Sequence, residues 1–262
     1  VSNPYPPVWD FLKDWVIRYD AAIFSAPAFS RRIGIPQYLI APSIDPLSDK
    51  NRDLEPSVIT GVLRKYGIPE DKPIVTQISR FDRLKDPVGV IRAYLLVKKY
   101  VDCRLVLAGG GAADDPEGAK VLEEVMELAK KDPEIHVLLL PQDDIAVNAL
   151  QRASTVIMQK SIKEGFGLTI SEALWKGKPV IAGNVGGIPL QIKHRHSGML
   201  VNSIEGAALA LKQLLNSPEF AAKLGENGRE HVRHNFLLTR HLKDYLLVFL
   251  SLFHKGEDIV SL

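Results

Sequence analysis

The sequence predicts an α/β fold built on a doubly wound parallel sheet. From residue 73 onward, short apolar runs alternate with amphipathic segments of helical length. Crossovers of that length imply parallel strands joined with right-handed connections. Such sheets bind ligands at the carboxyl ends of their strands, near the point where the strand order reverses. The loops after residues 78, 108, 140, 158 and 181 are therefore expected at one common edge.

The first strand is expected at residues 74–78. Asp86 and Pro87 are typical of an N-cap and a first helical position. The helix that they open should bury Ile91, Tyr94 and Leu95, which share one face. The elements expected next are strand 105–107, a helix opened by Asp115-Pro116-Glu117 with a stripe of Val121, Leu122, Val125, Leu128 and Ala129, strand 135–140, helix 144–153, strand 155–158, helix 168–175 and strand 180–181.

The two ends of the chain differ from this alternation. The elements expected before residue 49 are a helix over 9–19 and strands at 21–24 and 38–41, with a connector through residues 42–55. After residue 203 the chain should be helical, with Ser217-Pro218-Glu219 capping one helix and a last helix beginning at about Leu238. Residues 245–253 are too apolar to face water on every side, so they require a partner surface.

Composition limits the classes of function. A net charge of +2 disfavours a nucleic-acid binder. No apolar run approaches the roughly 20 residues of a membrane span, and no secretory signal is visible. Cys103, the one cysteine, has no intrachain partner, which favours a reducing compartment and a cytoplasmic location. The first residue is not Met, which leaves a fragment or a processed product open.

Two glycines and two glutamates surround the start of the expected helix 168–175. Gly165 and Gly167 allow a ligand to approach the backbone, and the free N–H groups of a helix start favour an anion such as a diphosphate. Glu164 and Glu172 could accept paired hydrogen bonds from the diols of a sugar and a ribose. A tight turn with a solvated Glu164, and with Glu172 as a helix-dipole carboxylate, explains the same pattern equally well.

Arg80 and Lys85 follow the first strand, on the same expected edge. Together they could neutralise a diphosphate, and part of that interaction would stabilise charge developing on the leaving group. The alternative is a solvated loop in which Arg80, Lys85 and Arg83 pair with Asp82 and Asp86, and for a basic loop alone this alternative is favoured.

The remaining motifs carry weaker signals. The glycines at 109–111 lack the spacing of dinucleotide binders, so a dehydrogenase is disfavoured. The turn at 183–189 either closes over a ligand or reverses the chain. His194 and His196 have cationic neighbours and no acidic partner at ligand spacing, so no metal site is expected, and His136 is expected to be structural.

The segment Glu164 to Leu168, followed by Glu172-Ala173, resembles the two-glutamate signature of family 4 retaining glycosyltransferases. Arg80 and Lys85 resemble the basic pair of that family. Residues 79–87, 108–116, 163–177 and 183–191 together resemble the trehalose glycosyltransferring synthases of the family. The resemblance implies the GT-B fold, in which two Rossmann-like domains face each other across a cleft. It also implies a division into the end of an N-terminal acceptor domain and connector (1–48), a nucleotide-sugar-binding domain (49–237) and a returning C-terminal helix (238–262).

The resemblance also implies roles and a reaction. The implied catalytic residues are Arg80, Lys85 and Glu164; the nucleotide-binding residues are Arg80, Lys85, Leu140, Leu168 and Glu172; and the donor-sugar-binding residues are Glu164, Gly165, Phe166 and Gly167. Glucose would pass from UDP-glucose or ADP-glucose to glucose, giving trehalose with retention at the donor carbon. No cofactor is required, and Mg²⁺ accompanying the diphosphate is left open.

One departure is length, because complete enzymes of this family are longer. We therefore expect this chain alone to bind nucleotide with little or no synthase activity, and to form a homo-oligomer through exposed apolar surface. Alternatives are another family 4 transferase such as a sucrose synthase or sucrose-phosphate synthase relative, a non-hydrolysing sugar-nucleotide epimerase, and a non-catalytic nucleotide-binding module.

Overall fold

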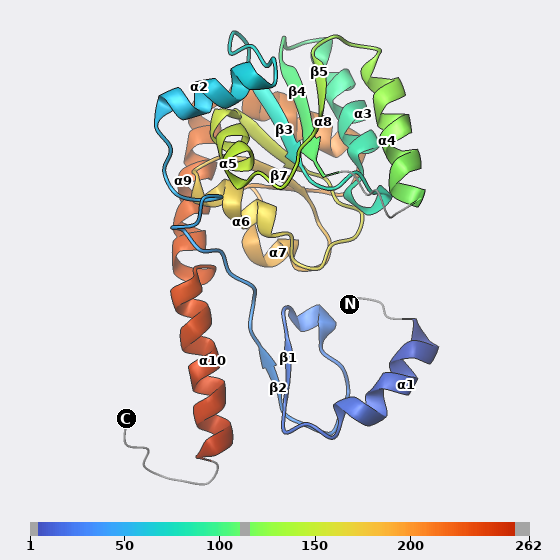
Figure 1. Ribbon diagram of the computed structural model, residues 1–262, viewed down its shortest axis with the longest axis vertical. Coiled ribbons are helices and arrows are strands. Elements are labelled where there is room, and N and C mark those ends of the chain that lie inside the picture. The colour runs from blue at the N-terminus through green and yellow to red at the C-terminus, as the bar shows by residue number, and fades with distance from the viewer. Residues whose placement is uncertain (1–4, 111–115, 255–262) are drawn as a thin grey trace.

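The computed structural model describes residues 5–110 and 116–254, and its largest part is the parallel sheet expected from the sequence (Figure 1). The strands lie in the order β5-β4-β3-β6-β7-β8, and each neighbouring pair is parallel. The strand order reverses between β3 and β6, which is therefore the switch point of the sheet. The strands are β3 (Ile74–Ile78), β4 (Arg104–Gly109), β5 (Ile135–Leu139), β6 (Val156–Gln159), β7 (Val180–Gly183) and β8 (Met199–Val201).

Helices cover both faces of the sheet because successive strand residues point to opposite faces. In β4, Leu105 and Leu107 pack in one core with α3 (Pro87–Lys98), α4 (Pro116–Ala129) and α8 (Ile204–Asn216). Val106 and Ala108 of the same strand pack in the opposite core with α2 (Pro56–Lys65) and α5 (Asp144–Ala153). On this second face, α6 (Leu168–Trp175) packs against α9 (Pro218–Asn235).

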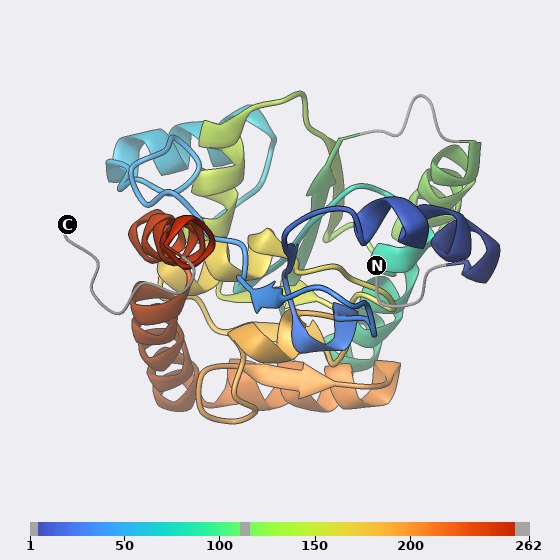
Figure 2. The same ribbon diagram turned by 90° about the horizontal axis from the view of Figure 1, so that it is seen from below.

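The N-terminal part forms a smaller body on the side to which the carboxyl ends of the strands point (Figures 1 and 2). It contains α1 (Pro6–Val16), the parallel pair β1 (Ala22–Phe24) and β2 (Gln37–Leu39), and a 3-10 turn between them at Pro27–Phe29. No residue of α1 is buried. Its apolar side chains Phe11 and Trp15 are 69% and 55% exposed, so α1 leaves apolar surface uncovered.

The chain passes between the two bodies twice, and the two passages are joined. The N–H of Ile44 donates to Phe236 O at 2.8 Å, and the N–H of Leu238 donates to Ile44 O at 3.0 Å. From there α10 (Leu238–Phe253) runs beside the N-terminal body, where the hydroxyls of Tyr38 and Ser251 lie 2.7 Å apart. Within α10 only Val248 is buried, so the apolar surface expected at 245–253 is present and largely uncovered.

Several elements differ from the expectations. The first helix begins at Pro6 and ends at Val16, because the proline pair at 6–7 suits the first turn. The sequence pattern missed α2, which follows the charged connector, the three-residue strand β8 and the single turn α7 (Ile188–Gln191). Ser217 precedes α9 but makes no side-chain cap, and Asp115 lies outside the described residues. Among the described helices, none is both long and apolar enough to cross a bilayer.

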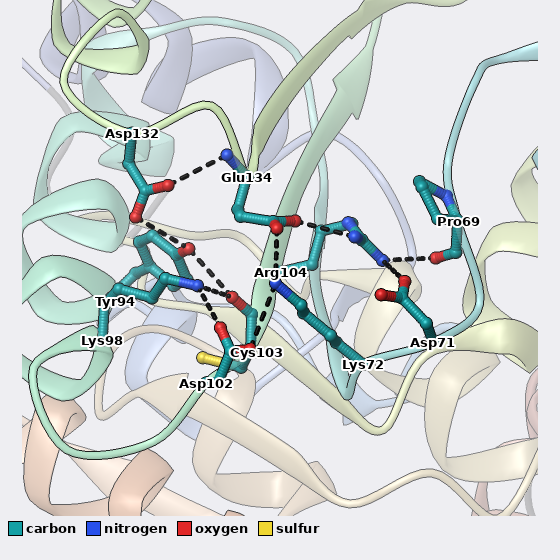
Figure 3. A network of polar contacts seen from close by, with 10 residues as sticks. All are labelled: Pro69, Asp71, Lys72, Tyr94, Lys98, Asp102, Cys103, Arg104, Asp132 and Glu134. Atoms are coloured by element: carbon teal, nitrogen blue, oxygen red, sulfur yellow. Dashed lines mark hydrogen bonds and ion pairs between the residues drawn. The ribbon is translucent and has the colours of Figure 1, made fainter.

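A network of charged side chains closes the edge where the strands begin (Figure 3). The Arg104 side chain is only 3% exposed and pairs with Glu134 at 2.7 Å and Asp71 at 3.0 Å. Lys72 joins Glu134 at 2.6 Å to Asp102 at 3.1 Å. The hydrogen bond from Lys72 holds the pKa of the Glu134 carboxyl below its usual range. Each ion of this network is thus compensated by more than one neighbour or by the surrounding backbone.

Candidate functional site

A cavity of about 430 Å³ opens at the carboxyl edge of the sheet, at the switch point. Its floor includes Ile78 and Gln159, which end β3 and β6. Arg80, Lys85 and Glu164 also line it, so the three side chains implied as catalytic meet in one place. The complete lining is Pro42, Ile78, Ser79, Arg80, Lys85, Gln159, Glu164, Phe166, Gly167, Leu168, Thr169 and Ile170.

Lys85 and Glu164 form an ion pair across the cavity, and each is held in place locally. The Asp82 carboxylate accepts the N–H of Lys85 at 3.0 Å and so caps the turn Arg83–Lys85. The Gln77 amide donates to Lys85 O at 2.8 Å. The Glu164 carboxylate accepts the N–H of Gly165 at 3.1 Å as well as the Lys85 ammonium. With 22% and 13% of their side chains exposed, the pair is ordered but remains in contact with water.

Arg80 is held much more loosely. Its guanidinium is 69% exposed and pairs with Asp82 at 3.2 Å. Because water surrounds most of the guanidinium, and Asp82 also accepts the N–H of Lys85, Arg80 can leave Asp82 at small cost. The alternative of a loop paired within itself is therefore partly correct: Arg80 pairs with Asp82 and Arg83 with Glu117, whereas Lys85 reaches Glu164 and Asp86 pairs with Lys160.

The two glycine-rich turns pack against each other. Gly167 has φ +84° and precedes the first residue of α6, so the loop turns sharply before the helix begins. Gly186 has φ +58°, and a Cβ there would lie 1.8 Å from Glu164 O. The N–H of Gly187 donates to Gly165 O at 2.8 Å. The turn at 183–189 thus supports the backbone that carries Glu164 and Phe166.

The start of α6 faces the same cavity, since Gly167, Leu168 and Thr169 are among its lining residues. The first N–H groups of a helix have no partner within it and carry a partial positive charge. Phe166 is 6% exposed and packs edge-on against Phe236, with ring centroids 5.5 Å apart. The cavity therefore offers an anion two cationic side chains and a helix start on a rigid support.

Two residues implied as nucleotide ligands lie differently. Glu172 is 8% exposed and does not line the cavity. Burial raises the pKa of its carboxyl, while the Lys50 and Lys176 ammonium groups oppose that shift. Leu140 is 6% exposed and packs in the core with Val106. A contact from Leu140 to a ligand at this edge would have to come from its backbone.

Sequence reasoning did not single out Pro42, Ser79, Gln159 or Thr169, although all four line the cavity. Gln159 is 4% exposed, and its amide donates to Ile78 O at 2.7 Å, which fixes the ends of β3 and β6 together. Its position at a strand end was the available signal. No cluster of potential metal ligands occurs among residues 5–110 and 116–254.

A known protein family matches the part of the chain that forms the cavity. The family model described as "Glycosyl transferases group 1" matches residues 61–231, which include every part of the cavity except Pro42. Among curated relatives, trehalose synthase from Rubrobacter xylanophilus is 43% identical over 256 residues, covering 96% of this chain and 61% of that protein. Trehalose synthase from Pyrococcus horikoshii is 41% identical over 260 residues, covering 96% and 62%.

A more distant relative is the trehalose phosphorylase of Pleurotus pulmonarius, 31% identical over 88% of this chain and 36% of that protein. The chain spans about three fifths of the length of the trehalose synthases that it matches. Of solved structures, sucrose-phosphate synthase from Thermosynechococcus elongatus has a TM-score of 0.81 at 24% identity, covering 97% of this chain and 64% of that one. An Anabaena protein crystallised with UDP and glucose has a TM-score of 0.80 at 17% identity, covering 95% and 68%. These structures share the fold.

Proposed function

The chain belongs to the group 1 glycosyl transferase family, and we propose that it is the donor-binding part of a retaining enzyme that makes trehalose. The enzyme would transfer glucose from a nucleoside diphosphoglucose to glucose. The observation that carries the proposal is the convergence of Arg80, Lys85, Glu164 and the start of α6 on one cavity. The identity of 41–43% to trehalose synthases supports the choice of product.

The diphosphate of the donor would lie between the two cations and the start of α6. Charge-assisted hydrogen bonds of this kind contribute roughly 1.5–3 kcal/mol each. Arg80 is free to turn from Asp82 to a phosphate, because its guanidinium is largely exposed. Lys85 would exchange the Glu164 carboxylate for a phosphate oxygen, and the released Glu164 could then accept hydrogen bonds from glucose hydroxyls.

The reaction breaks the bond between the donor's anomeric carbon and the diphosphate oxygen. A new bond forms between that carbon and the anomeric oxygen of the acceptor glucose, on the same face of the donor. The acceptor proton passes to the departing phosphate, so no side-chain base is needed. Negative charge grows on the diphosphate as the bond breaks, and the two bound cations therefore stabilise the transition state more than the ground state.

Glu172 keeps the role of ribose ligand in this proposal, although it is buried behind the cavity lining. It lies on α6, four residues after Leu168, so it faces the same side of the helix as that lining residue. A ribose entering beside Leu168 would have to displace part of the packing over the carboxylate. The role of Glu172 therefore needs a direct test.

Calorimetry of this chain with UDP and with ADP tests the proposal. We expect the wild type to bind at least one of them, and both Arg80→Ala and Glu172→Ala to bind it more weakly. Unchanged affinity in both variants would remove the proposed site. The relative named trehalose phosphorylase supplies a second candidate. In that reaction inorganic phosphate, and not a nucleoside diphosphate, would be the group to which glucose is attached or from which it is released. Phosphate binding that Arg80→Ala/Lys85→Ala reduces, without binding of either nucleotide by the wild type, would favour that candidate.

The expectations of self-association and a cytoplasmic location remain part of the proposal. Leu242, Leu246 and Phe253 of α10 are 59%, 52% and 80% exposed, which supplies the apolar surface for self-association. Sedimentation of the chain over a range of concentrations tests this point, and a monomeric mass throughout would count against it.

A further inference from the structure

A second cavity, of about 270 Å³, lies between the connector, α5, α6 and α9 and shares no lining residue with the first. Figure 1 shows the connector passing beside α6 and α9 before it reaches α2. The lining is Pro46, Leu47, Asn51, Arg52, Asp53, Arg152, Trp175, Lys176 and Arg229. The proposed glycosyl transfer makes no use of any of these residues.

The charges around this cavity do not balance. Four cations line it, namely Arg52, Arg152, Lys176 and Arg229, and the described lining contains one carboxylate, Asp53. Asp53 pairs with Arg152 at 2.8 Å, but its side chain is 92% exposed, so water screens most of its charge. Arg52 has a partner in Asp49, which is also mostly exposed. The cavity therefore keeps an excess of positive charge.

The donors of these cations are only partly used. Arg152 donates through Nε to Asn148 and through Nη2 to the connector, while within the described chain its Nη1 has no acceptor. Lys176 donates to Asn51 and to Glu172 O, at 3.0 and 3.1 Å, which leaves one of its three N–H groups. Arg229 makes no ion pair with any described residue; its guanidinium lies 5.3 Å from the centre of the Trp175 ring.

Burial disturbs the pKa of the lysine that lines this cavity. Burial lowers the pKa of Lys176 to about 7, and the neighbouring Arg152 and Lys50 act in the same direction while Glu172 opposes it. Lys178, the next lysine along the chain, is displaced the same way by burial and by Arg152. A buried cation without enough negative charge around it is stabilised when an anion binds beside it.

We infer that this cavity binds a small phosphate-bearing anion, with Arg229, Lys176 and Arg152 as its ligands. Guanidinium groups donate paired hydrogen bonds to phosphate oxygens, whereas the lysine acts as a point charge. Pro46, Leu47 and Trp175 give the lining an apolar part, which would contact the body of a phosphate ester. Since drug-sized ligands occupy roughly 300–1,000 Å³, the smaller cavity suits inorganic phosphate or a sugar monophosphate rather than a nucleotide.

The inference is tested in a variant whose first cavity cannot retain phosphate. Calorimetry of Arg80→Ala/Lys85→Ala is carried out at constant ionic strength with inorganic phosphate, with glucose 6-phosphate and with uncharged glucose. We expect a Kd below about 1 mM for at least one of the two phosphates and no binding of glucose. Tighter binding of glucose 6-phosphate would identify the sugar monophosphate as the ligand, and equal binding would identify phosphate itself.

Two arginines of α9 provide a matched pair of further substitutions in that background. Arg229→Gln removes a cavity ligand, and we expect it to raise the Kd at least tenfold. Arg233→Gln removes an exposed arginine one turn later, which pairs with Glu230 and does not line the cavity, and we expect no change. Trp175 fluorescence should respond to the phosphate, and Trp175→Phe should abolish that response.

Two results would overturn phosphate binding by the second cavity, and both are independent of the proposed function. Absence of binding by either phosphate in the double variant overturns the inference, as does an equal Kd in Arg229→Gln and Arg233→Gln. Neither result touches nucleotide binding by the wild type, which depends on the first cavity. Conversely, loss of the nucleotide site leaves the outcome for the second cavity unchanged.

Discussion

The two edges of the sheet carry the same kinds of ions and use them differently. At the amino edge, Arg104 is 3% exposed and shares Glu134 with Lys72, in a closed network with backbone partners (Figure 3). At the carboxyl edge, Arg80 is 69% exposed, and Lys85 and Glu164 pair one-to-one beside a cavity. An ion pair is therefore structural when its ions have no cavity beside them, and available to a ligand when they do.

The largest effect is expected from breaking the closed network. Arg104→Ala should lower the free energy of unfolding by about 3–5 kcal/mol, because it removes a side chain that is only 3% exposed together with its charge-assisted hydrogen bonds to Glu134 and to Pro69 O. Urea denaturation measures this change. Lys130→Ala, which breaks the exposed pair with Glu127, should change stability by no more than about 0.5 kcal/mol. Similar losses in the two variants would contradict the structural role of the amino edge.

The open pair should behave in the opposite way. Lys85→Ala should weaken nucleotide binding by roughly 1.5–3 kcal/mol, about 10- to 150-fold, because a charge-assisted hydrogen bond is lost. The free energy of unfolding of Lys85→Ala should fall much less than that of Arg104→Ala. Arg83→Ala is the control, since Arg83 is in the same turn but pairs with Glu117 and does not line the cavity. Calorimetry with UDP and ADP measures the affinity of both variants. Equal affinity of Lys85→Ala and Arg83→Ala would contradict the role of Lys85 in binding.

The support beneath Glu164 allows a finer test. Gly186→Ala places a Cβ 1.8 Å from Glu164 O, so the loop must move, at a cost of about 1–3 kcal/mol, and nucleotide affinity should fall with it. Gly177→Ala is matched for backbone conformation, with φ +70° and open space at its Cβ. It should show the conformational cost alone and leave binding intact. Equal binding by both variants would mean that the turn at 183–189 does not position the site.

The smallest expected effect is the loss of stability at low pH that is due to Glu134. The pKa of the Glu134 carboxyl is lowered by its hydrogen bond from Lys72, so its stabilising contribution is complete above the unfolded-state pKa of about 4.5. That contribution is lost as the pH falls through the lower, folded-state value. Stability should therefore decline between about pH 5 and 3, and Glu134→Gln should reduce the slope of that decline. Urea unfolding curves of the wild type and Glu134→Gln at several pH values measure this. The same decline of stability with pH in both proteins would contradict the prediction.

Much of the fold was predictable because buried strands leave a dense apolar signal. The helices at 144–153 and 168–175 and the strand at 74–78 have the bounds that the sequence predicts. By contrast, β8 has only three residues and α2 mixes polar with apolar residues, and these two elements pack against β7 and α5. Local pattern alone does not report such tertiary contacts.

The site was predictable in its parts but not in its connections. Strand ends and glycines located Arg80, Lys85 and Glu164 at one edge, where the structure brings them together. The pairing of Lys85 with Glu164 joins residues 79 positions apart, so no local spacing announces it. The burial of Glu172 and Leu140 depends on what packs over them, which sequence periodicity does not specify. Their roles in nucleotide binding remain predictions.

The hydrogen bonds of Ile44 to Phe236 and Leu238 have a mechanical consequence. Two separate tethers would let the bodies twist and slide independently, but two tethers bonded side by side act as one pivot. Movement of the N-terminal body relative to the sheet would therefore have to carry both tethers together at this strip. Pro42, which lines the first cavity, lies two residues before Ile44, so a movement at this strip would displace part of the cavity lining.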